Sequence, residues 1–151
     1  MSDGPTFRQL TLTDMAAVSN VFRTTFDARL PWLGGLHSQA EDRDFWSGYL
    51  FSTCTIWGAG QQDDLLGVIA FREGWVDQLY VLPPMQGQGV GSRLLDIAKT
   101  SHHRLNLWTF QRNEGARHFY EAQGFQAVRE TDGADNEERE PDILYSWRRC
   151  A

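Results

Sequence analysis

The spacing of apolar residues alternates along the chain between the two-residue period of strands and the three-to-four-residue period of helices. Apolar residues from Met15 to Phe26 recur on one side of a helix that Thr13 and Asp14 can cap. Ser38 and Glu41 have the spacing of a capping box, which predicts the start of a second helix. The pattern therefore predicts a chain in which helices and strands are mixed.

The predicted elements, in chain order, are a strand over 6–12, a helix over 13–29, a loop over 30–37, a helix over 38–50, strands over 51–58, 65–72 and 75–81, a helix that a glycine-rich loop opens and that continues through 98, a strand over 105–110, a helix over 113–124, and strands over 125–130 and 143–147. This order, β-α-α-β-β-β-α-β-α-β-β, predicts an α/β fold with a mixed sheet. A chain of 151 residues is long enough for one core, so we expect a single domain over residues 1–151.

Composition supports a packed protein of the cytoplasm. The chain is 41% hydrophobic and contains six Trp and nine Phe, which is too apolar for a disordered chain. The first residues lack the basic start and apolar run of a signal peptide, and no stretch has the length of a membrane span. Cys54 and Cys150 lie far apart and give no metal-site spacing, so we expect two free thiols, with Cys54 packed in a strand.

The formal charge of −6 is concentrated in residues 130–142, where seven acidic residues stand against one arginine. Glycine, asparagine and proline interrupt this segment, and such a composition favours a solvated loop over a cation-binding role. Neither interpretation suits nucleic acid, which requires a basic surface. We therefore expect no nucleic acid partner.

Glycine occupies every second position from Gly87 to Gly91, directly before an apolar helical pattern. A loop that lacks Cβ atoms and meets a helix N-terminus can bind a phosphate through backbone N–H groups. A nucleotide triphosphate loop would need a lysine after the second glycine, and the single lysine, Lys99, comes too late. A dinucleotide fingerprint would end at Ser92 and would meet Gln111 where an acidic residue is expected. A capping loop without a ligand is the remaining alternative.

Two blocks of sequence resemble the GNAT family of N-acetyltransferases. The first is Gln86-x-x-Gly89-x-Gly91, which is similar to the acyl-coenzyme A loop of that family. The second runs from Leu107 to Phe125 and contains N-x-x-A-x-x-F-Y-E-x-x-G-F, similar to the next strand and helix of the family. Together the blocks cover roughly residues 75–128, in the right order. The resemblance implies a sheet splayed between its fourth and fifth strands, where coenzyme A would lie.

The resemblance also implies acetyl-CoA as the cofactor and a set of residues that bind it. The backbone of the loop would hold the pyrophosphate, the pantetheine arm would add to the preceding strand, and an asparagine would contact that arm while it caps a helix. The implied cofactor-binding residues are Leu79, Tyr80, Val81, Gln86, Gly87, Gln88, Gly89, Val90, Gly91, Ser92 and Asn113.

Tyr120 is the predicted general acid, because a phenol with a pKa near ~10 stays protonated at neutral pH and can give its proton to the leaving thiolate. The family commonly uses the matching tyrosine in this way, although packing of the helix on the sheet is the alternative role. Asp77 is the candidate base: strict alternation would place it on the same face as Leu79 and Val81. A surface ion pair for Asp77, with water relaying the proton, is the alternative.

Trp108 stands where GNAT enzymes that acetylate ribosomal-protein N-termini carry an acidic residue, which puts that activity in doubt. Trp108, Trp32 and Phe26, with His37 in the loop at residues 30–37, instead predict an aromatic acceptor site, unless these rings belong to the core.

The sequence thus predicts an acetyl-CoA-dependent N-acetyltransferase, of class EC 2.3.1, that acts by direct transfer on a primary amine of a small molecule, without a metal. Transfer to a protein amine and a non-catalytic acyl-CoA sensor are the alternatives. A homodimer is possible, because dimers are common among similar proteins.

Overall fold

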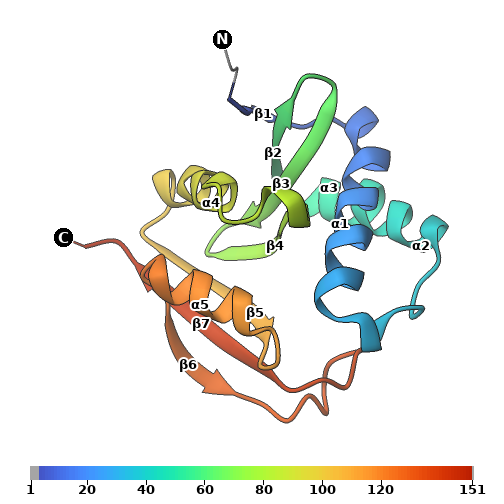
Figure 1. The fold of residues 1–151 in the computed structure, drawn as a ribbon. Coiled ribbons are helices and arrows are strands. Elements are labelled where there is room, and N and C mark those ends of the chain that lie inside the picture. Colours follow the sequence, from blue (N-terminus) through green and yellow to red (C-terminus); the bar gives the residue numbers. More distant parts are fainter. Residues whose placement is uncertain (1–3, 151) are drawn as a thin grey trace.

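A computed structural model describes residues 4–150 of the protein. Figure 1 shows the elements, which are β1 (Thr6–Gln9), α1 (Met15–Arg29), α2 (Gln39–Asp44), α3 (Phe51–Thr53), β2 (Thr55–Gln61), β3 (Asp64–Arg72), β4 (Trp75–Val81), α4 (Val90–Thr100), β5 (Arg104–Phe110), α5 (Glu114–Ala122), β6 (Gln126–Glu130) and β7 (Asp142–Arg148). The strands form one seven-stranded mixed sheet in the order β1-β2-β3-β4-β5-β7-β6. The predicted α/β fold and element order are confirmed.

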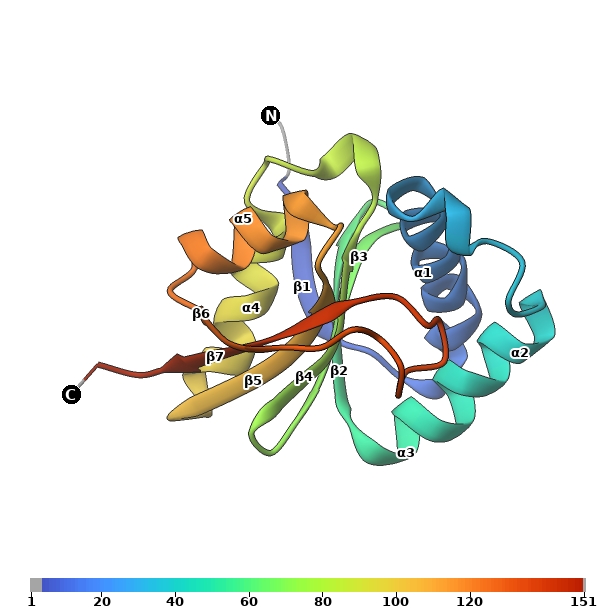
Figure 2. The ribbon, with the colours of Figure 1, turned by 90° about the horizontal axis from the view of Figure 1, so that it is seen from below.

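Two hydrophobic cores cover the two faces of the sheet. Figure 2 shows α4 and α5 on one face and α1, α2 and α3 on the other. We call the core under α4 and α5 the α4–α5 core and the core under α1, α2 and α3 the α1 core. Val68 and Ile69 are consecutive on β3 and both fully buried, but they belong to different cores because successive side chains of a strand point to opposite faces. The centre of the sheet is therefore apolar on both sides, which explains the unbroken apolar run of β3.

The sheet divides between β4 and β5. These strands are parallel, and the single paired position between them in the described part of the chain is Trp75 with Asn106. Beyond it each strand pairs on its other side only, β4 with β3 and β5 with β7. The predicted splay between the fourth and fifth strands is thus present, and it leaves one edge of β4 open toward the gap.

The helical region after the loop at 30–37 is longer than the sequence predicts. The Ser38–Glu41 capping box starts α2, and a π-helix over Phe45–Leu50 leads directly into α3. The expected strand from residue 51 therefore starts only at Thr55, and Cys54 lies between the two elements rather than in a strand. Trp46, which lies in the predicted helix, is fully buried in the α1 core, so this helical segment packs directly against the sheet and α1. No helix among residues 4–150 is both long and apolar enough to cross a bilayer.

An ion pair fastens α1 to α2. The Arg23 guanidinium donates from Nε and Nη2 to the two carboxylate oxygens of Asp42, each at 2.8 Å. The Asp42 side chain is only 5% exposed. Because a carboxylate removed from water is costly without a partner, this pair is needed to keep α2 against α1.

Replacing Arg23 with Met should lower the free energy of unfolding by about 3–5 kcal/mol, since it strands the buried Asp42 carboxylate. Urea denaturation followed by circular dichroism measures this loss. Arg8→Met is the matched control: it breaks the Arg8–Asp14 pair, in which the Arg8 side chain is 60% exposed, and should cost about 1 kcal/mol or less. Equal losses in the two variants would contradict a structural role for the Arg23–Asp42 pair.

Candidate functional site

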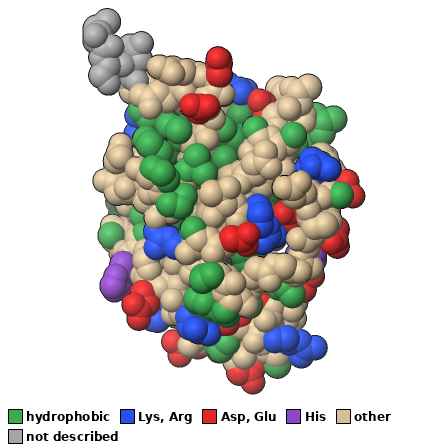
Figure 3. All heavy atoms as spheres, turned by 45° about the vertical axis from the view of Figure 1, so that its right-hand side comes forward, with side chains coloured by type: hydrophobic (Ala, Val, Ile, Leu, Met, Phe, Trp, Pro, Cys, Tyr) green, Lys and Arg blue, Asp and Glu red, His purple; other side chains and the backbone are tan. Residues whose placement is uncertain are grey.

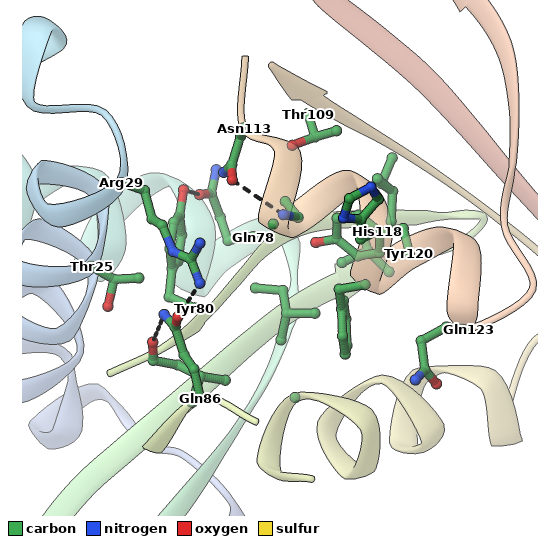
Figure 4. A pocket seen from close by; sticks show the side chains of 18 of the residues that line it. Thr25, Arg29, Gln78, Tyr80, Gln86, Thr109, Asn113, His118, Tyr120 and Gln123 are labelled. Atoms are coloured by element: carbon green, nitrogen blue, oxygen red, sulfur yellow. Dashed lines mark hydrogen bonds between the residues drawn. The ribbon is translucent and has the colours of Figure 1, made fainter. Parts of the chain in front are cut away.

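A cleft with a volume of about 630 Å³ occupies the gap between the two halves of the sheet. Its walls come from α1, β4, the glycine-rich loop, the start of α4, β5 and α5 (Figure 4). The residues of the predicted site that line it are Phe26, Asp77, Leu79, Tyr80, Val81, Gln86, Gly87, Gly89, Gly91, Ser92, Trp108, Asn113 and Tyr120. Gln88 is exposed outside the cleft, and Val90 is buried in the core beneath the loop.

The glycine-rich loop has a shape that other residues could adopt only under strain. Gly87 and Gly89 have φ values of +80° and +86°, in the left-handed region that favours glycine. A Cβ on Gly91 would lie 3.2 Å from the Phe119 ring, so this glycine permits α4 and α5 to approach each other. Gly89 caps α4, whose first backbone N–H groups have no partner within the helix. The loop thus presents the positive end of α4 to the cleft.

Gln86 braces this loop. Its Nε2 donates to the Val81 carbonyl oxygen at 2.8 Å, and its Oε1 accepts a hydrogen bond from Arg29 at the end of α1. The side chain therefore joins β4, the loop and α1 at one side of the cleft, as the dashed lines in Figure 4 show.

Strict alternation predicts that Asp77 shares a face with Leu79 and Val81, and this prediction is wrong. Val76 pairs with Phe71 and Gln78 with Ala70, so Asp77 is the extra residue of a β-bulge that breaks the alternation. Leu79 packs against the α4–α5 core, whereas the Asp77 Oδ2 accepts hydrogen bonds from Arg72 Nε at 2.8 Å and from Cys54 Sγ at 3.3 Å. The Asp77 carboxylate thus forms an ion pair with Arg72, which is the role that the sequence offered as the alternative to a catalytic base.

The thiol of Cys54 is correspondingly unreactive. Its burial, followed by the hydrogen bond to Asp77, raises the pKa of the Cys54 thiol to about 11. At neutral pH the group is therefore a thiol and a poor nucleophile.

Tyr120 lies on α5, 8% exposed, with its ring against Phe119, Phe125 and Tyr145. Desolvation raises the pKa of its phenol well above the usual value, which keeps the group protonated at neutral pH. Figure 4 shows the hydroxyl directed toward the cleft. Packing and proton donation are thus compatible, because the ring is held by neighbours while the hydroxyl is presented to the gap.

Asn113 and Tyr80 also combine a structural contact with a place on the cleft wall. Asn113 Oδ1 accepts from the Ala116 N–H at 3.2 Å, which makes it the N-cap of α5 as predicted. The Tyr80 hydroxyl donates to Gln78 Oε1 at 2.7 Å, and its ring meets the Phe22 ring with centroids 5.1 Å apart. Gly124 ends the α5 region with a φ of +92°, as its predicted C-cap position requires.

Trp32 and His37 lie outside the cleft, in contrast to Phe26 and Trp108. Trp32 Nε1 donates to Glu140 at 2.9 Å, and the Arg112 guanidinium lies 3.8 Å from its ring centroid. His37 Nε2 lies 2.8 Å from Glu137 Oε1. Of the loop at residues 30–37, Leu30 lines the cleft, whereas Trp32 and His37 contact the acidic segment, so the prediction that these two belong to the acceptor site is wrong.

The acidic segment forms a second cavity, of about 450 Å³, which sequence analysis missed. Trp108, Thr109 and Phe110 of β5 separate it from the cleft and line both spaces. Its other residues are Arg129, Thr131, Asp132, Asp135, Asn136, Glu138 and Asp142. Burial, and then the neighbouring Glu137, raise the pKa of the Glu138 carboxyl. In the sequence, the signal for this cavity was the cluster of acidic residues, and such a cluster also suits a solvated loop.

Acidic and basic side chains are interspersed with apolar atoms on the face shown in Figure 3. This face therefore offers no continuous basic surface to a phosphate backbone.

These features define a class of protein: a mixed sheet, opened between two parallel strands, with a glycine-rich helix N-terminus beside the opening, a feature that suits an anionic ligand. The family model of the acetyltransferase (GNAT) domain matches residues 52–127, about half of the chain. The protein belongs to the GNAT family.

Relatives agree with this membership. A peptidyl-lysine N-acetyltransferase, YiaC of Escherichia coli K12, is 32% identical over 93 residues, which span 60% of this chain and 62% of that protein. The solution structure of apo YjaB from Escherichia coli has a TM-score of 0.78 at 20% identity, covering 95% of this chain and 97% of that one. The PaiA N-acetyltransferase of Thermoplasma acidophilum, solved with coenzyme A, has a TM-score of 0.74 at 19% identity, covering 99% of this chain and 100% of that one.

The His37 ring should titrate above its ordinary value near ~6.5, because the hydrogen bond to Glu137, and less so that to Glu41, raises the pKa of the imidazole. The contact therefore stabilises the fold fully below the unfolded pKa and is lost as pH rises through the raised folded pKa. An NMR titration of the ring measures the value. Glu137→Gln should return the pKa toward ~6.5, and Glu41→Gln should change it less; an unchanged value in Glu137→Gln would contradict the contact.

Proposed function

We propose that the protein transfers the acetyl group of acetyl-CoA directly to a primary amine, and that residues 1–151 form one such acetyltransferase domain. The observation that carries the proposal is the open edge of β4 facing Tyr120 across a cleft that begins at the glycine-rich loop. A thioester ligand laid along this edge has a phosphate site at one end and a proton donor at the other.

The cofactor would be held chiefly by backbone groups. The N–H groups from Gly87 to Ser92 would bind the pyrophosphate at the N-terminus of α4. The amides of the pantetheine arm would pair with β4 at Leu79, Tyr80 and Val81, as an added strand does. A backbone N–H near Leu79 would face the thioester oxygen and stabilise the negative charge that develops on it.

In the proposed reaction the amine nitrogen attacks the thioester carbonyl, a C–N bond forms, and the C–S bond breaks. Tyr120 gives its proton to the departing thiolate, and the proton that the nitrogen loses as the amide forms passes through water and restores the phenol. A primary amine with a pKa near ~10.4 must first lose a proton, and we assign that proton to water, because Asp77 is held in an ion pair with Arg72 and its Oδ2 also accepts from Cys54. Attack on the thioester in a ternary complex needs no acyl-enzyme, which agrees with the raised pKa of Cys54.

For the acceptor, we propose a small amine with an apolar portion that contacts Phe26, Phe110 and Trp108. All three rings line the cleft, and the Phe26 and Phe110 centroids are 6.5 Å apart. A protein lysine is the second candidate, favoured by the activity named for the YiaC relative. The free thiols Cys54 and Cys150 support the cytoplasm as the proposed compartment. The possible homodimer stays a prediction.

Tyr120→Phe should lower kcat by about 10²–10⁴-fold, since it removes the proton donor to the thiolate, and should leave the dissociation constant for coenzyme A within about twofold. Thiol release is followed by colour with a panel of small amines, polyamines, aminoglycosides and lysine peptides. Tyr145→Phe is the matched control, because the Tyr145 hydroxyl donates to Glu121 and accepts from Arg117, and Tyr145 does not line the cleft.

Equal turnover in Tyr120→Phe and the natural protein would remove Tyr120 from the mechanism. Coenzyme A binding without acetyl transfer to any acceptor would instead support a non-catalytic sensor. Turnover confined to lysine peptides would favour the protein acceptor.

A further inference from the structure

Arg29, the last residue of α1, crosses the side of the cleft (Figure 4). Its Nη2 donates to Gln86 Oε1, and its guanidinium lies against Gly115 in the first turn of α5. A Cβ on Gly115 would collide with Nη1 and would lie 3.3 Å from Cζ, so glycine leaves the space that the guanidinium fills. One side chain thus spans three elements that bound the proposed cofactor site.

The positive charge of Arg29 has no carboxylate partner in the described part of the protein. Arg8, Arg23, Arg72 and Arg112 each meet a carboxylate, but no ion pair among residues 4–150 includes Arg29. Its hydrogen-bond partner is a neutral amide. The guanidinium also lies beside the N-terminus of α5, where the helix dipole favours an anion and disfavours a cation. An anion placed here would relieve this unfavourable arrangement.

Thr25 supplies an independent sign that this wall of the cleft faces a ligand. It lies one turn before Arg29 on α1, lines the same cleft and is 5% exposed. Its Oγ1 is buried and has no hydrogen-bond partner in the described part of the protein. Buried hydroxyls almost always have a hydrogen-bond partner. We therefore expect a ligand in the cleft to form a hydrogen bond with the Thr25 hydroxyl.

We propose that Arg29 binds the diphosphate of coenzyme A, from the side opposite to the loop amides. The proposal rests on the proposed function, because it assumes that the cofactor lies between the glycine-rich loop and α5. On binding, the guanidinium exchanges the neutral Gln86 oxygen for phosphate oxygens, which form stronger, charge-assisted hydrogen bonds. The loop N–H groups and Arg29 then enclose the diphosphate from two sides, and α1 becomes part of the cofactor site.

A purely steric role would make the opposite prediction. If Arg29 only obstructed the cleft, its removal would improve the binding of every ligand that enters, charged or not. Coenzyme A and pantetheine share the thiol-bearing arm but differ in the phosphates, so they separate the two roles.

Isothermal titration calorimetry with both ligands provides the test. Arg29→Gln should weaken coenzyme A binding by about 10–100-fold, the range expected for a lost hydrogen bond to a charged group, and should leave pantetheine within about twofold. Arg29→Lys should recover part of the loss. Arg43→Gln is the matched control: it makes the same charge change on the exposed surface of α2, outside both cavities, and should bind coenzyme A as the natural protein does.

An unchanged or improved affinity of Arg29→Gln for coenzyme A would overturn the proposal, and so would equal losses for coenzyme A and pantetheine. Inorganic pyrophosphate separates this outcome from failure of the proposed function. If the natural protein binds pyrophosphate but not coenzyme A, and Arg29→Gln abolishes that binding, the anion site stands and the cofactor assignment fails. If it binds neither ligand, both proposals fail.

Discussion

The separation of β4 from β5 is the constraint on which the site depends. The two strands share one paired position, Trp75 with Asn106, and each is fixed on its other side by an antiparallel neighbour. Backbone groups along the open edge of β4 lack the strand that would pair with them, and unpaired buried amides are costly. A ligand that lies in the gap and has amides of its own can form hydrogen bonds with these unpaired backbone groups of β4.

The two cores keep this gap open from opposite sides. The α4–α5 core holds Leu79 and Tyr120, and the α1 core holds Phe22 against Tyr80. Successive residues of β4 are therefore anchored to different layers, and neither half of the sheet can close on the other without breaking a core. The same helix α1 that seals the second core also carries Thr25 and Arg29 into the cleft, so one element serves both stability and ligand binding.

The acidic segment is linked to the helical side of the molecule across a long stretch of chain. Trp32 bonds to Glu140, whose carboxylate also lies 3.7 Å from Arg112, and His37 meets Glu137. These contacts bring the loop before α2 and the loop before β7 together. Other residues of the loop before β7 line the second cavity beside Trp108. Glu140 is buried, but Asp132, Asp135 and Glu137 are exposed, so most of the acidic segment is solvated as its composition predicts.

The sequence by itself determined the features that depend on neighbours a few residues apart: the order of the elements, the caps at Ser38, Asn113 and Gly124, and the glycine-rich loop, because caps, turns and helical faces are local. Tertiary structure alone decided which chemistry meets in the cleft. A bulge turned the Asp77 carboxylate to Arg72 and Cys54, packing placed Trp32 and His37 against the acidic segment, and α1 brought Arg29 to Gln86 across 57 positions. Such contacts depend on strand register and on how separate layers pack, and no local pattern encodes either.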